Sequence, residues 1–165
     1  RKRETEVDGV DYLFVDEPEF RDLEQRGELL EWAQVFDNFY ATSRRQVDTH
    51  LDAGNPVILE IDWQGARQVR GSMPDCVSIF ILPPSVSELE RRLRSRRTDS
   101  DSVIERRLRD ARSDIAPWDE FDSIVINDDL ERAVTDLESI FAGGGAALAT
   151  DRPETVSAVN DILSK

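Results

Sequence analysis

The chain has 165 residues, of which 35 are acidic and 21 basic, so its formal net charge is −14. Such a charge opposes non-specific binding to nucleic acid and to anionic membranes. The sequence contains no apolar run near the ~20 residues that span a bilayer. One cysteine and one histidine supply neither a disulfide framework nor a zinc site built on those side chains. These features predict one soluble, cytoplasmic domain without a nucleic-acid or membrane partner.

The first third of the chain is typical of a small antiparallel lobe. Three apolar segments predict strands, at residues 10–15, 29–36 and 39–42. Helices are predicted between Pro18 and Gly27 and over residues 44–53. Ser43 suits the N-cap of the second helix, and Gly54 suits its end. The second and third strands, separated by two residues, indicate a hairpin.

The remainder predicts strands that alternate with helices. The strand candidates are short and almost continuously apolar, as in a sheet covered on both faces: residues 56–61, 76–82 and 123–127. The helix candidates are residues 63–72, 85–96, 102–115 and 130–142. This alternation indicates an α/β fold with a parallel sheet. Beyond the glycines at 143–145, residues 154–163 favour a short amphipathic helix, either docked on the body or frayed.

Two acidic residues, Glu60 and Asp62, lie at the carboxyl end of the strand predicted at residues 56–61. Open α/β sheets bind ligands at the carboxyl ends of their strands, and strand alternation points both side chains the same way. Carboxylates in this place can accept hydrogen bonds from a ligand or hold a hydrated Mg²⁺ through water. Alternatively, Asp62 is simply the N-cap of the next helix.

The predicted hairpin carries a second candidate site, with Glu31 on one strand and Tyr40 and Thr42 on the other. A glutamate can accept two parallel N–H bonds, which suits the N1–H and exocyclic amine of guanine. A threonine hydroxyl can add a contact to a base, and a tyrosine hydroxyl can donate to phosphate. A half-exposed hairpin with ordinary polar decoration explains the same residues equally well.

Arginines gather in the segments 91–97 and 106–109, in an otherwise acidic chain. Clustered arginines bind phosphate bidentately and can neutralise charge that develops during phosphoryl transfer. The alternative is a solvated helix face on which these arginines pair with neighbouring acidic residues such as Glu88 and Glu90. Glu88 also has capping-box spacing to Ser85.

Taken in order, six stretches resemble the guanylate kinase family over about residues 3–141. They are EVDGVDY, LLEWAQVFDNFYATS, ILEIDWQGARQVR, SIFILPPSVSELERRLRSR, DSVIERRL and IVINDDL. The resemblance implies a P-loop nucleoside monophosphate kinase-like α/β fold. In this fold a parallel sheet has helices on both faces, an inserted antiparallel GMP-binding lobe (about 3–53) and a helical lid (about 92–117). The kinase-like domain would cover residues 1–142, followed by a glycine-rich break and tail helix at 143–165.

The resemblance also implies the reaction and the residues that serve it. The γ-phosphoryl group of ATP, bound with Mg²⁺, would pass to GMP and give ADP and GDP; a homodimer stays open. The GMP-binding positions are Arg3, Tyr12, Glu31, Tyr40, Thr42, Glu60 (where the family usually has Asp) and Asp62. The arginines expected to act in catalysis over the ATP phosphates are Arg92, Arg96 and Arg107. Asn127 would join Arg92 and Arg96 in binding ATP, on the adenine side.

One family feature is absent: no G-x-x-x-x-G-K-[ST] phosphate loop occurs in the 165 residues. We therefore expect an N-terminally truncated guanylate kinase that by itself lacks turnover and binds GMP weakly. Two rivals stay open. One is a non-catalytic guanylate-kinase-like module that binds phosphopeptides. The other is a related P-loop kinase for a sugar phosphate, against which Glu31 and Thr42 argue, because a sugar has no guanine edge.

Overall fold

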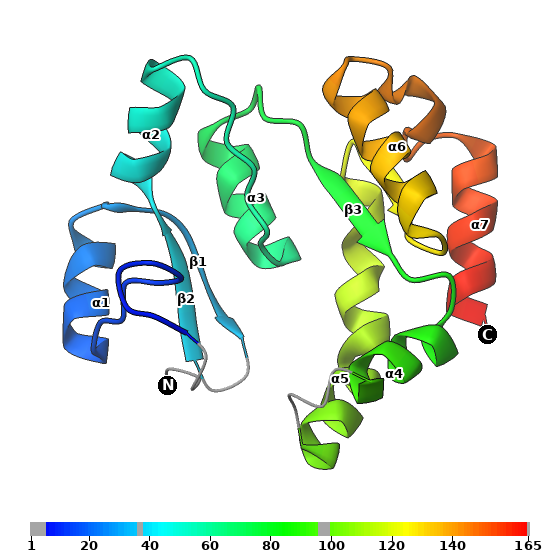
Figure 1. The fold of residues 1–165 in the computed structure, drawn as a ribbon, viewed down its shortest axis with the longest axis horizontal. Coiled ribbons are helices and arrows are strands. Elements are labelled where there is room, and N and C mark those ends of the chain that lie inside the picture. Colours follow the sequence, from blue (N-terminus) through cyan, green and yellow to red (C-terminus); the bar gives the residue numbers. More distant parts are fainter. Residues whose placement is uncertain (1–5, 36–37, 96–99, 165) are drawn as a thin grey trace. The chain divides into compact units, whose positions relative to one another are not determined.

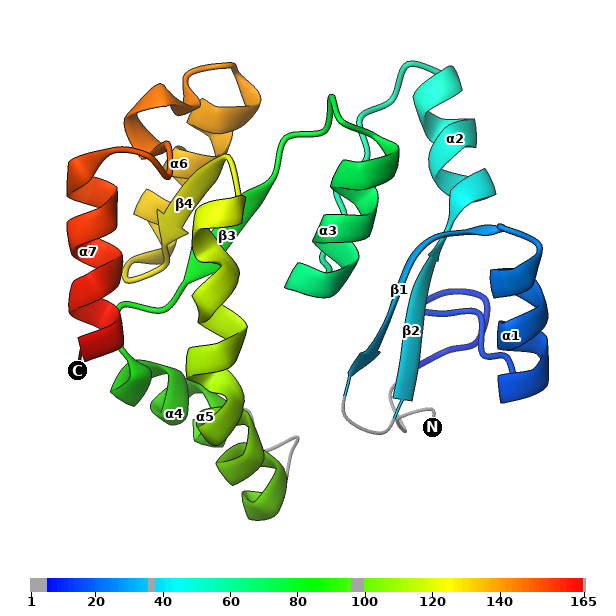
Figure 2. The ribbon, with the colours of Figure 1, turned by 180° about the vertical axis from the view of Figure 1, so that it is seen from behind.

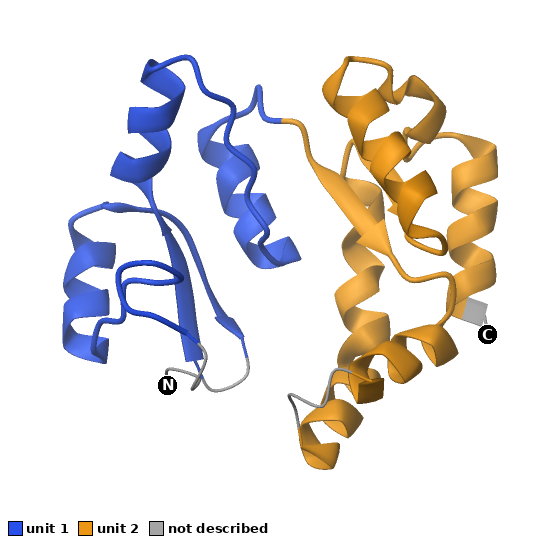
Figure 3. Cartoon of the chain, in the orientation of Figure 1, with its two compact units in different colours: residues 1–76 blue, residues 77–165 orange. Residues whose placement is uncertain are grey.

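The computed structural model describes residues 6–35, 38–95 and 100–164. They form an α/β protein (Figures 1 and 2). The chain divides into two compact units, Arg1–Cys76 and Val77–Lys165, which Figure 3 shows in different colours. Among the described residues, the buried apolar side chains form one core in unit 1 and two in unit 2. Among the helices of the described residues, none combines the length and the apolar character that a membrane span requires.

Unit 1 is an antiparallel hairpin with three helices. Its elements are α1 (Glu17–Gln25), β1 (Leu29–Val35), β2 (Asn38–Ser43), α2 (Arg44–Asp52) and α3 (Trp63–Ser72). All three helices begin at a side-chain cap, because Asp16, Ser43 and Asp62 each accept a hydrogen bond from a backbone N–H three residues later. Gly27 and Gly54, with φ of 68° and 78°, follow α1 and α2. These observations confirm the predicted helix boundaries and the hairpin.

The core of unit 1 joins the hairpin to two helices. Leu30 on β1, Val47 on α2 and Val69 on α3 are buried together. Side chains of the segment before α3 and of the chain after it pack against this centre: Val57, Leu59, Ile61, Met73 and Cys76. Helix α1 contacts the hairpin through rings, since Phe20 packs against Trp32 and Phe39 at centroid distances of 6.0 Å and 5.2 Å.

A β-bulge interrupts the hairpin at its first residues. Leu29 pairs with Ser43, whereas Glu31 pairs with Thr42, so two steps of β1 span one step of β2. Regular alternation would send Leu30 and Glu31 to opposite faces of the sheet. Both are only 4% exposed. The bulge therefore lets a leucine and the glutamate that follows it be buried in succession, which brings a carboxylate inside the unit.

The prediction of a strand at residues 10–15 is wrong, because this segment forms a local turn instead. The side chains of Asp8 and Asp11 accept hydrogen bonds from the backbone N–H groups of Phe14 and Val7, at 3.0 Å and 2.7 Å. Gly9, with φ of 77°, donates to the Tyr12 carbonyl at 2.7 Å. Aspartate side chains compete with strand pairing for backbone donors, and the Asp8–Gly9 pair supplies the turn.

The prediction of a strand at residues 56–61 is also wrong, because these described residues do not form one. Val57, Leu59 and Ile61 pack on the core of unit 1, while Ile58 between them is 69% exposed. The segment thus has the alternating burial of a strand, but its backbone does not form the hydrogen bonds of a sheet. A strand forms only when a neighbouring strand supplies hydrogen bonds, and apolar pattern alone does not reveal which neighbour is present.

Unit 2 is built around a two-stranded parallel sheet. Its elements are β3 (Ile79–Leu82), α4 (Val86–Ser95), α5 (Asp101–Ile115), η1 (Ala116–Glu120), β4 (Ser123–Ile126), α6 (Leu130–Phe141), η2 (Gly145–Leu148) and α7 (Pro153–Ser164). Strands β3 and β4 pair in register from Ile79 opposite Ser123. The parallel pairing and the helices between the strands confirm the predicted α/β class.

Helices cover both faces of this sheet, as the apolar strands predicted (Figure 2). On one face Val125 packs with Ala133 and Ile140 of α6. On the other face Leu82 and Ile124 pack with residues of α5 and α7. Successive residues of β4 thus enter two different cores, which accounts for its unbroken apolar sequence.

The segment after the glycine break is docked, which settles the alternative left open by the sequence. Ala149 forms an antiparallel bridge with Ser123 of β4. The Thr150 hydroxyl donates to the Phe121 carbonyl at 2.6 Å. In α7, Val159 is fully buried and Ile162 is 4% exposed, both within the core that contains β3 and β4. The tail helix is therefore part of the body of unit 2.

Candidate functional site

A buried carboxylate lies at the centre of unit 1. Glu31 Oε1 accepts a hydrogen bond from the Thr42 hydroxyl, with an O···O distance of 2.5 Å. Gly65, in the first turn of α3, lies against the other oxygen: a Cβ built there would overlap Glu31 Oε2 and stand 3.1 Å from Cδ. The carboxylate is thus held between β2 and α3, and it approaches the helix this closely because residue 65 has no side chain.

Desolvation raises the pKa of Glu31 above its ordinary value of 4.5. The hydrogen bond from Thr42 acts in the opposite direction, and the negative charge of Asp62 raises the pKa further. Asp62 caps α3, since its Oδ1 accepts from Gly65 N–H at 2.9 Å and its Oδ2 accepts from Gln64 Nε2 at 3.1 Å. The N-cap interpretation of Asp62 is therefore confirmed, and the cap also fixes a second carboxylate whose field acts on Glu31.

A side-chain amide ties the strand of Glu31 to the helix of Asp62. Gln68 of α3 donates through Nε2 to the Trp32 carbonyl at 2.6 Å and accepts from Trp32 N–H through Oε1 at 3.1 Å. Both backbone groups of one residue are thus bound by one amide. This pair of bonds fixes β1 against α3 immediately next to Glu31.

The two predicted tyrosines lie together in unit 1. The rings of Tyr12 and Tyr40 meet edge to face, with centroids 6.0 Å apart, and both are more than a third exposed. Glu60 is exposed and Asp62 is half-buried, on the segment that does not form the expected strand. Arg3 lies outside the described residues.

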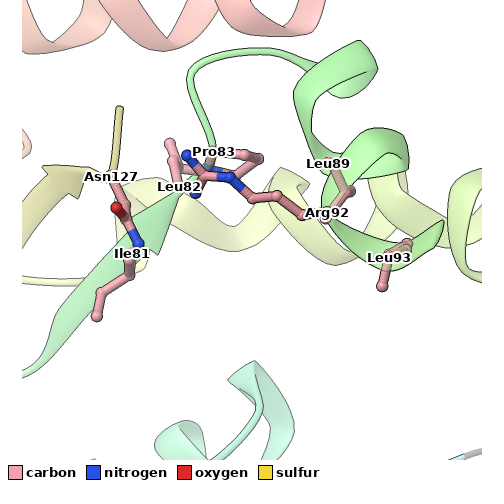
Figure 4. A pocket seen from close by; sticks show the side chains of 7 residues that line it. All are labelled: Ile81, Leu82, Pro83, Leu89, Arg92, Leu93 and Asn127. Carbon is pink, nitrogen blue, oxygen red and sulfur yellow. The ribbon is translucent and has the colours of Figure 1, made fainter. Parts of the chain in front are cut away.

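A separate pocket opens in unit 2 where β3 and β4 end. Its lining combines apolar side chains with one guanidinium and one carboxamide: Ile81, Leu82, Pro83, Leu89, Arg92, Leu93 and Asn127. Figure 4 shows Arg92 extending from α4 toward the side where Asn127 lies. The structure therefore brings two of the predicted site residues, Arg92 and Asn127, to one concave surface at the carboxyl ends of parallel strands.

The remaining arginines differ in their surroundings. Arg92 Nε donates to Glu88 at 2.7 Å, while Arg94 Nε donates to Glu90 at 2.8 Å. Arg107 is half-buried on α5, and Arg96 lies outside the described residues. Glu88 forms half of the predicted capping box: its backbone N–H donates to Ser85 Oγ at 3.1 Å, whereas its carboxylate binds arginines.

A model of the guanylate kinase family matches residues 1–143. The chain belongs to the guanylate kinase family. A guanylate kinase of Alkalilimnicola ehrlichii is 48% identical over 161 residues, which cover 98% of this chain and 79% of that protein. One of Pseudoalteromonas translucida is 44% identical over 162 residues, with the same coverage. The crystal structure of guanylate kinase from Anaplasma phagocytophilum matches with a TM-score of 0.73 at 33% identity, covering 96% of this chain and 79% of that one.

Membership of the guanylate kinase family confirms the resemblance found in the sequence. It makes the chain a member of a phosphotransferase family with a P-loop nucleoside monophosphate kinase fold. The family model ends at Gly143, so η2 and α7 follow the matched region. These two elements nevertheless supply Leu148, Val159 and Ile162 to the cores of unit 2.

The described residues do not bring together enough metal-binding side chains to hold a metal ion by themselves. In residues 6–35, 38–95 and 100–164 no three His, Cys, Asp or Glu side chains come together as metal ligands. Asp62, the residue expected to hold Mg²⁺ through water, accepts one hydrogen bond on each carboxylate oxygen, which leaves a further acceptor site on each. Mg²⁺ ions bound with nucleotides keep several waters and use phosphate oxygens as ligands, so such an ion does not require a cluster of protein carboxylates.

Sequence reasoning missed Gly65 and Gln68, which hold the Glu31 site together. A glycine inside a helix costs about 1 kcal/mol relative to alanine and therefore signals a packing or functional reason. Gly65, three residues after the N-cap Asp62, carries that signal. Gln68 carries none, because a glutamine on a helix is ordinary until the backbone it faces is known.

Replacing Gly65 by Ala is expected to destabilise the protein by about 1–3 kcal/mol, because the new Cβ overlaps the Glu31 carboxylate. Urea unfolding measures the change. Gly71→Ala in the same helix is the matched control: nothing lies within 4 Å of a Cβ there, so we expect a gain of about 0.5–1 kcal/mol. Equal effects of the two variants would contradict the close approach of Glu31 to α3.

Replacing Glu31 by Gln is expected to change how stability depends on pH. Because the native pKa of Glu31 is raised above 4.5, the native state holds this proton more tightly than the unfolded state does. Its contribution to stability is present in full below 4.5 and is lost as pH rises through the native pKa. The free energy of unfolding of Glu31→Gln relative to wild type should therefore increase across that window.

Urea unfolding from about pH 4 to about pH 8 measures this difference. The exposed Glu60 provides the control, since Glu60→Gln alters a carboxylate that is already in solvent. A difference between Glu31→Gln and wild type that stays constant across the range would show that the carboxylate is not buried at a cost.

Proposed function

We propose that this chain carries the two nucleotide sites of a guanylate kinase. Unit 1 binds GMP through Glu31, Thr42 and Asp62, with phosphate contacts from Tyr12 and Tyr40. Unit 2 binds ATP through Arg92 and Asn127. In the full reaction the γ-phosphoryl group of ATP passes to GMP and gives ADP and GDP. Curated relatives with this name, at 48% and 44% identity, support the assignment.

The buried Glu31 carboxylate is the observation that carries this proposal. Desolvated charge is costly, so a carboxylate that is 4% exposed calls for donors. Thr42 supplies one donor to Oε1. The guanine edge presents two adjacent donors, N1–H and the exocyclic amine, which match the two oxygens of a carboxylate. Adenine presents an unprotonated nitrogen at the same position, and that lone pair would face the carboxylate.

The ATP side depends on positive charge within an acidic protein. Phosphoryl transfer requires positioning and neutralisation of charge on the phosphates more than covalent chemistry. Arg92 at the pocket, with Arg96 and Arg107 as further candidates, would neutralise the phosphates, and Asn127 can hydrogen-bond the base edge. Mg²⁺ bound with ATP would supply further positive charge to neutralise the phosphates.

Calorimetric titration of the chain with GMP, IMP and AMP tests the GMP site. We expect GMP to bind most tightly, IMP less tightly because it has lost the exocyclic amine, and AMP about ten- to a hundredfold more weakly than GMP. Glu31→Gln should remove this order. Equal affinity for GMP and AMP, or binding of a phosphopeptide in place of GMP, would contradict the proposal.

A coupled ADP-release assay tests turnover by this polypeptide. Its 165 residues contain no G-x-x-x-x-G-K-[ST] motif to cradle the β- and γ-phosphates of ATP. We therefore expect the polypeptide to bind GMP without transferring phosphate at a rate above that of a buffer blank. Release of ADP that depends on both GMP and the wild-type chain would contradict this expectation.

A further inference from the structure

Glu88, in the first turn of α4, binds two neighbouring arginines. Its Oε1 accepts from Arg92 Nε and from Arg91 Nη2, both at 2.7 Å. Its Oε2 accepts from Arg91 Nε at 2.7 Å. These bonds lower the pKa of Glu88 to about 2, the hydrogen bond from Arg91 contributing most. The carboxylate is therefore ionised at any pH used for nucleotide binding.

Arg92 is bound at one edge and open at the other. The contact to Glu88 uses Nε, so the guanidinium plane is fixed through the atom nearest the side-chain stem. In the part of the chain that the structure describes, neither terminal nitrogen of Arg92 has a hydrogen-bond partner. Because the guanidinium is rigid and planar, fixing one edge sets the direction of the other. The side chain lines the pocket that also contains Asn127 (Figure 4).

Arg94 shows what an ordinary surface arginine looks like on the same helix. Its Nε donates to Glu90 at 2.8 Å and its Nη1 donates to Asp101 at 3.2 Å. It is 47% exposed, compared with 29% for Arg92, and it does not line the pocket. The two Glu–Arg pairs thus share the i,i+4 spacing and differ in whether the arginine faces a binding surface.

We propose that Glu88 is a positioning residue for ATP, which holds the Nε edge of Arg92 so that its terminal nitrogens face the nucleotide pocket. This inference rests on the proposed ATP site. Without Glu88, Arg92 would sample several rotamers, and ATP binding would have to order it. Glu88 itself touches no nucleotide and acts through Arg92.

Electrostatics alone gives the opposite sign, which makes the inference testable. ATP is a polyanion, so removal of a nearby carboxylate should strengthen binding through space. Loss of positioning should weaken it. A variant that removes negative charge and still binds ATP less tightly therefore reports on the orientation of Arg92.

The experiment compares Glu88→Ala, Glu88→Gln and the matched control Glu90→Ala by calorimetric titration of the full chain with Mg–ATP and, separately, with GMP. We expect Glu88→Ala to bind Mg–ATP about two- to tenfold more weakly than wild type, the range for ordering one long side chain. Glu88→Gln keeps an acceptor oxygen and should recover part of the loss. Glu90→Ala should bind Mg–ATP as tightly as wild type or more tightly. GMP affinity should not change in any variant, and urea unfolding of Glu88→Ala should match that of Glu90→Ala, which a loss of folding within unit 2 would not allow.

Each outcome has a distinct meaning. If Glu88→Ala binds Mg–ATP as Glu90→Ala does, or more tightly than wild type, the positioning role is wrong while the ATP site stands. If its affinity for GMP falls in parallel with that for Mg–ATP, the role is structural and the inference is again wrong. Wild-type chain that binds GMP and no Mg–ATP would overturn the proposed ATP site and, with it, this inference.

Discussion

The contact between the Glu31 carboxylate, the Thr42 hydroxyl and the backbone of Gly65 determines much of unit 1. A charge can be kept out of water only if the surrounding groups hold it in a defined place. Three elements meet that requirement: the bulged strand β1, its partner β2 and the first turn of α3. The helix caps at Ser43 and Asp62 and the core around Leu30, Val47 and Val69 also stabilise this arrangement, because they fix the backbone from which these side chains project.

Acidic and basic groups have different tasks in the two units. In unit 1 the carboxylates of Glu31 and Asp62 accept hydrogen bonds, and the negative charge of Asp62 is part of what raises the pKa of Glu31. In unit 2 the carboxylates Glu88 and Glu90 bind arginines on α4. Arginines can therefore cluster on α4 in a chain whose net charge is −14, because carboxylates of the same helix pair with them.

The sequence could predict those features that depend on neighbouring residues. Caps at Ser43 and Asp62, the hairpin, and the parallel strands covered on both faces all follow local rules, and the structure has them. The sequence could not predict features that depend on side chains competing for backbone hydrogen bonds or on contacts with residues distant in the chain. Asp8 and Asp11 accept hydrogen bonds from backbone N–H groups in a segment whose apolar pattern predicts a strand. Residues 56–61 have the alternating burial of a strand, but they do not pair with a neighbouring strand.

The candidate site likewise contains residues that the sequence could predict and contacts that it could not. Glu31, Thr42 and Asp62 could be found from residue type and from the family resemblance, yet their contacts depend on the bulge at Leu30, which no pattern in the sequence marks. Gly65 and Gln68 gained their meaning only when α3 was placed against β1.

The bonds between Gln68 and Trp32 also affect how the hairpin behaves toward other molecules. Because both the N–H and the carbonyl of Trp32 bind Gln68, this residue directs its backbone groups away from β2, toward the outer edge of β1. An open strand edge invites pairing with another chain. Here a glutamine amide occupies the donor and acceptor that an incoming strand would need. The bonds that align the Glu31 site thus also protect the hairpin from edge-to-edge association.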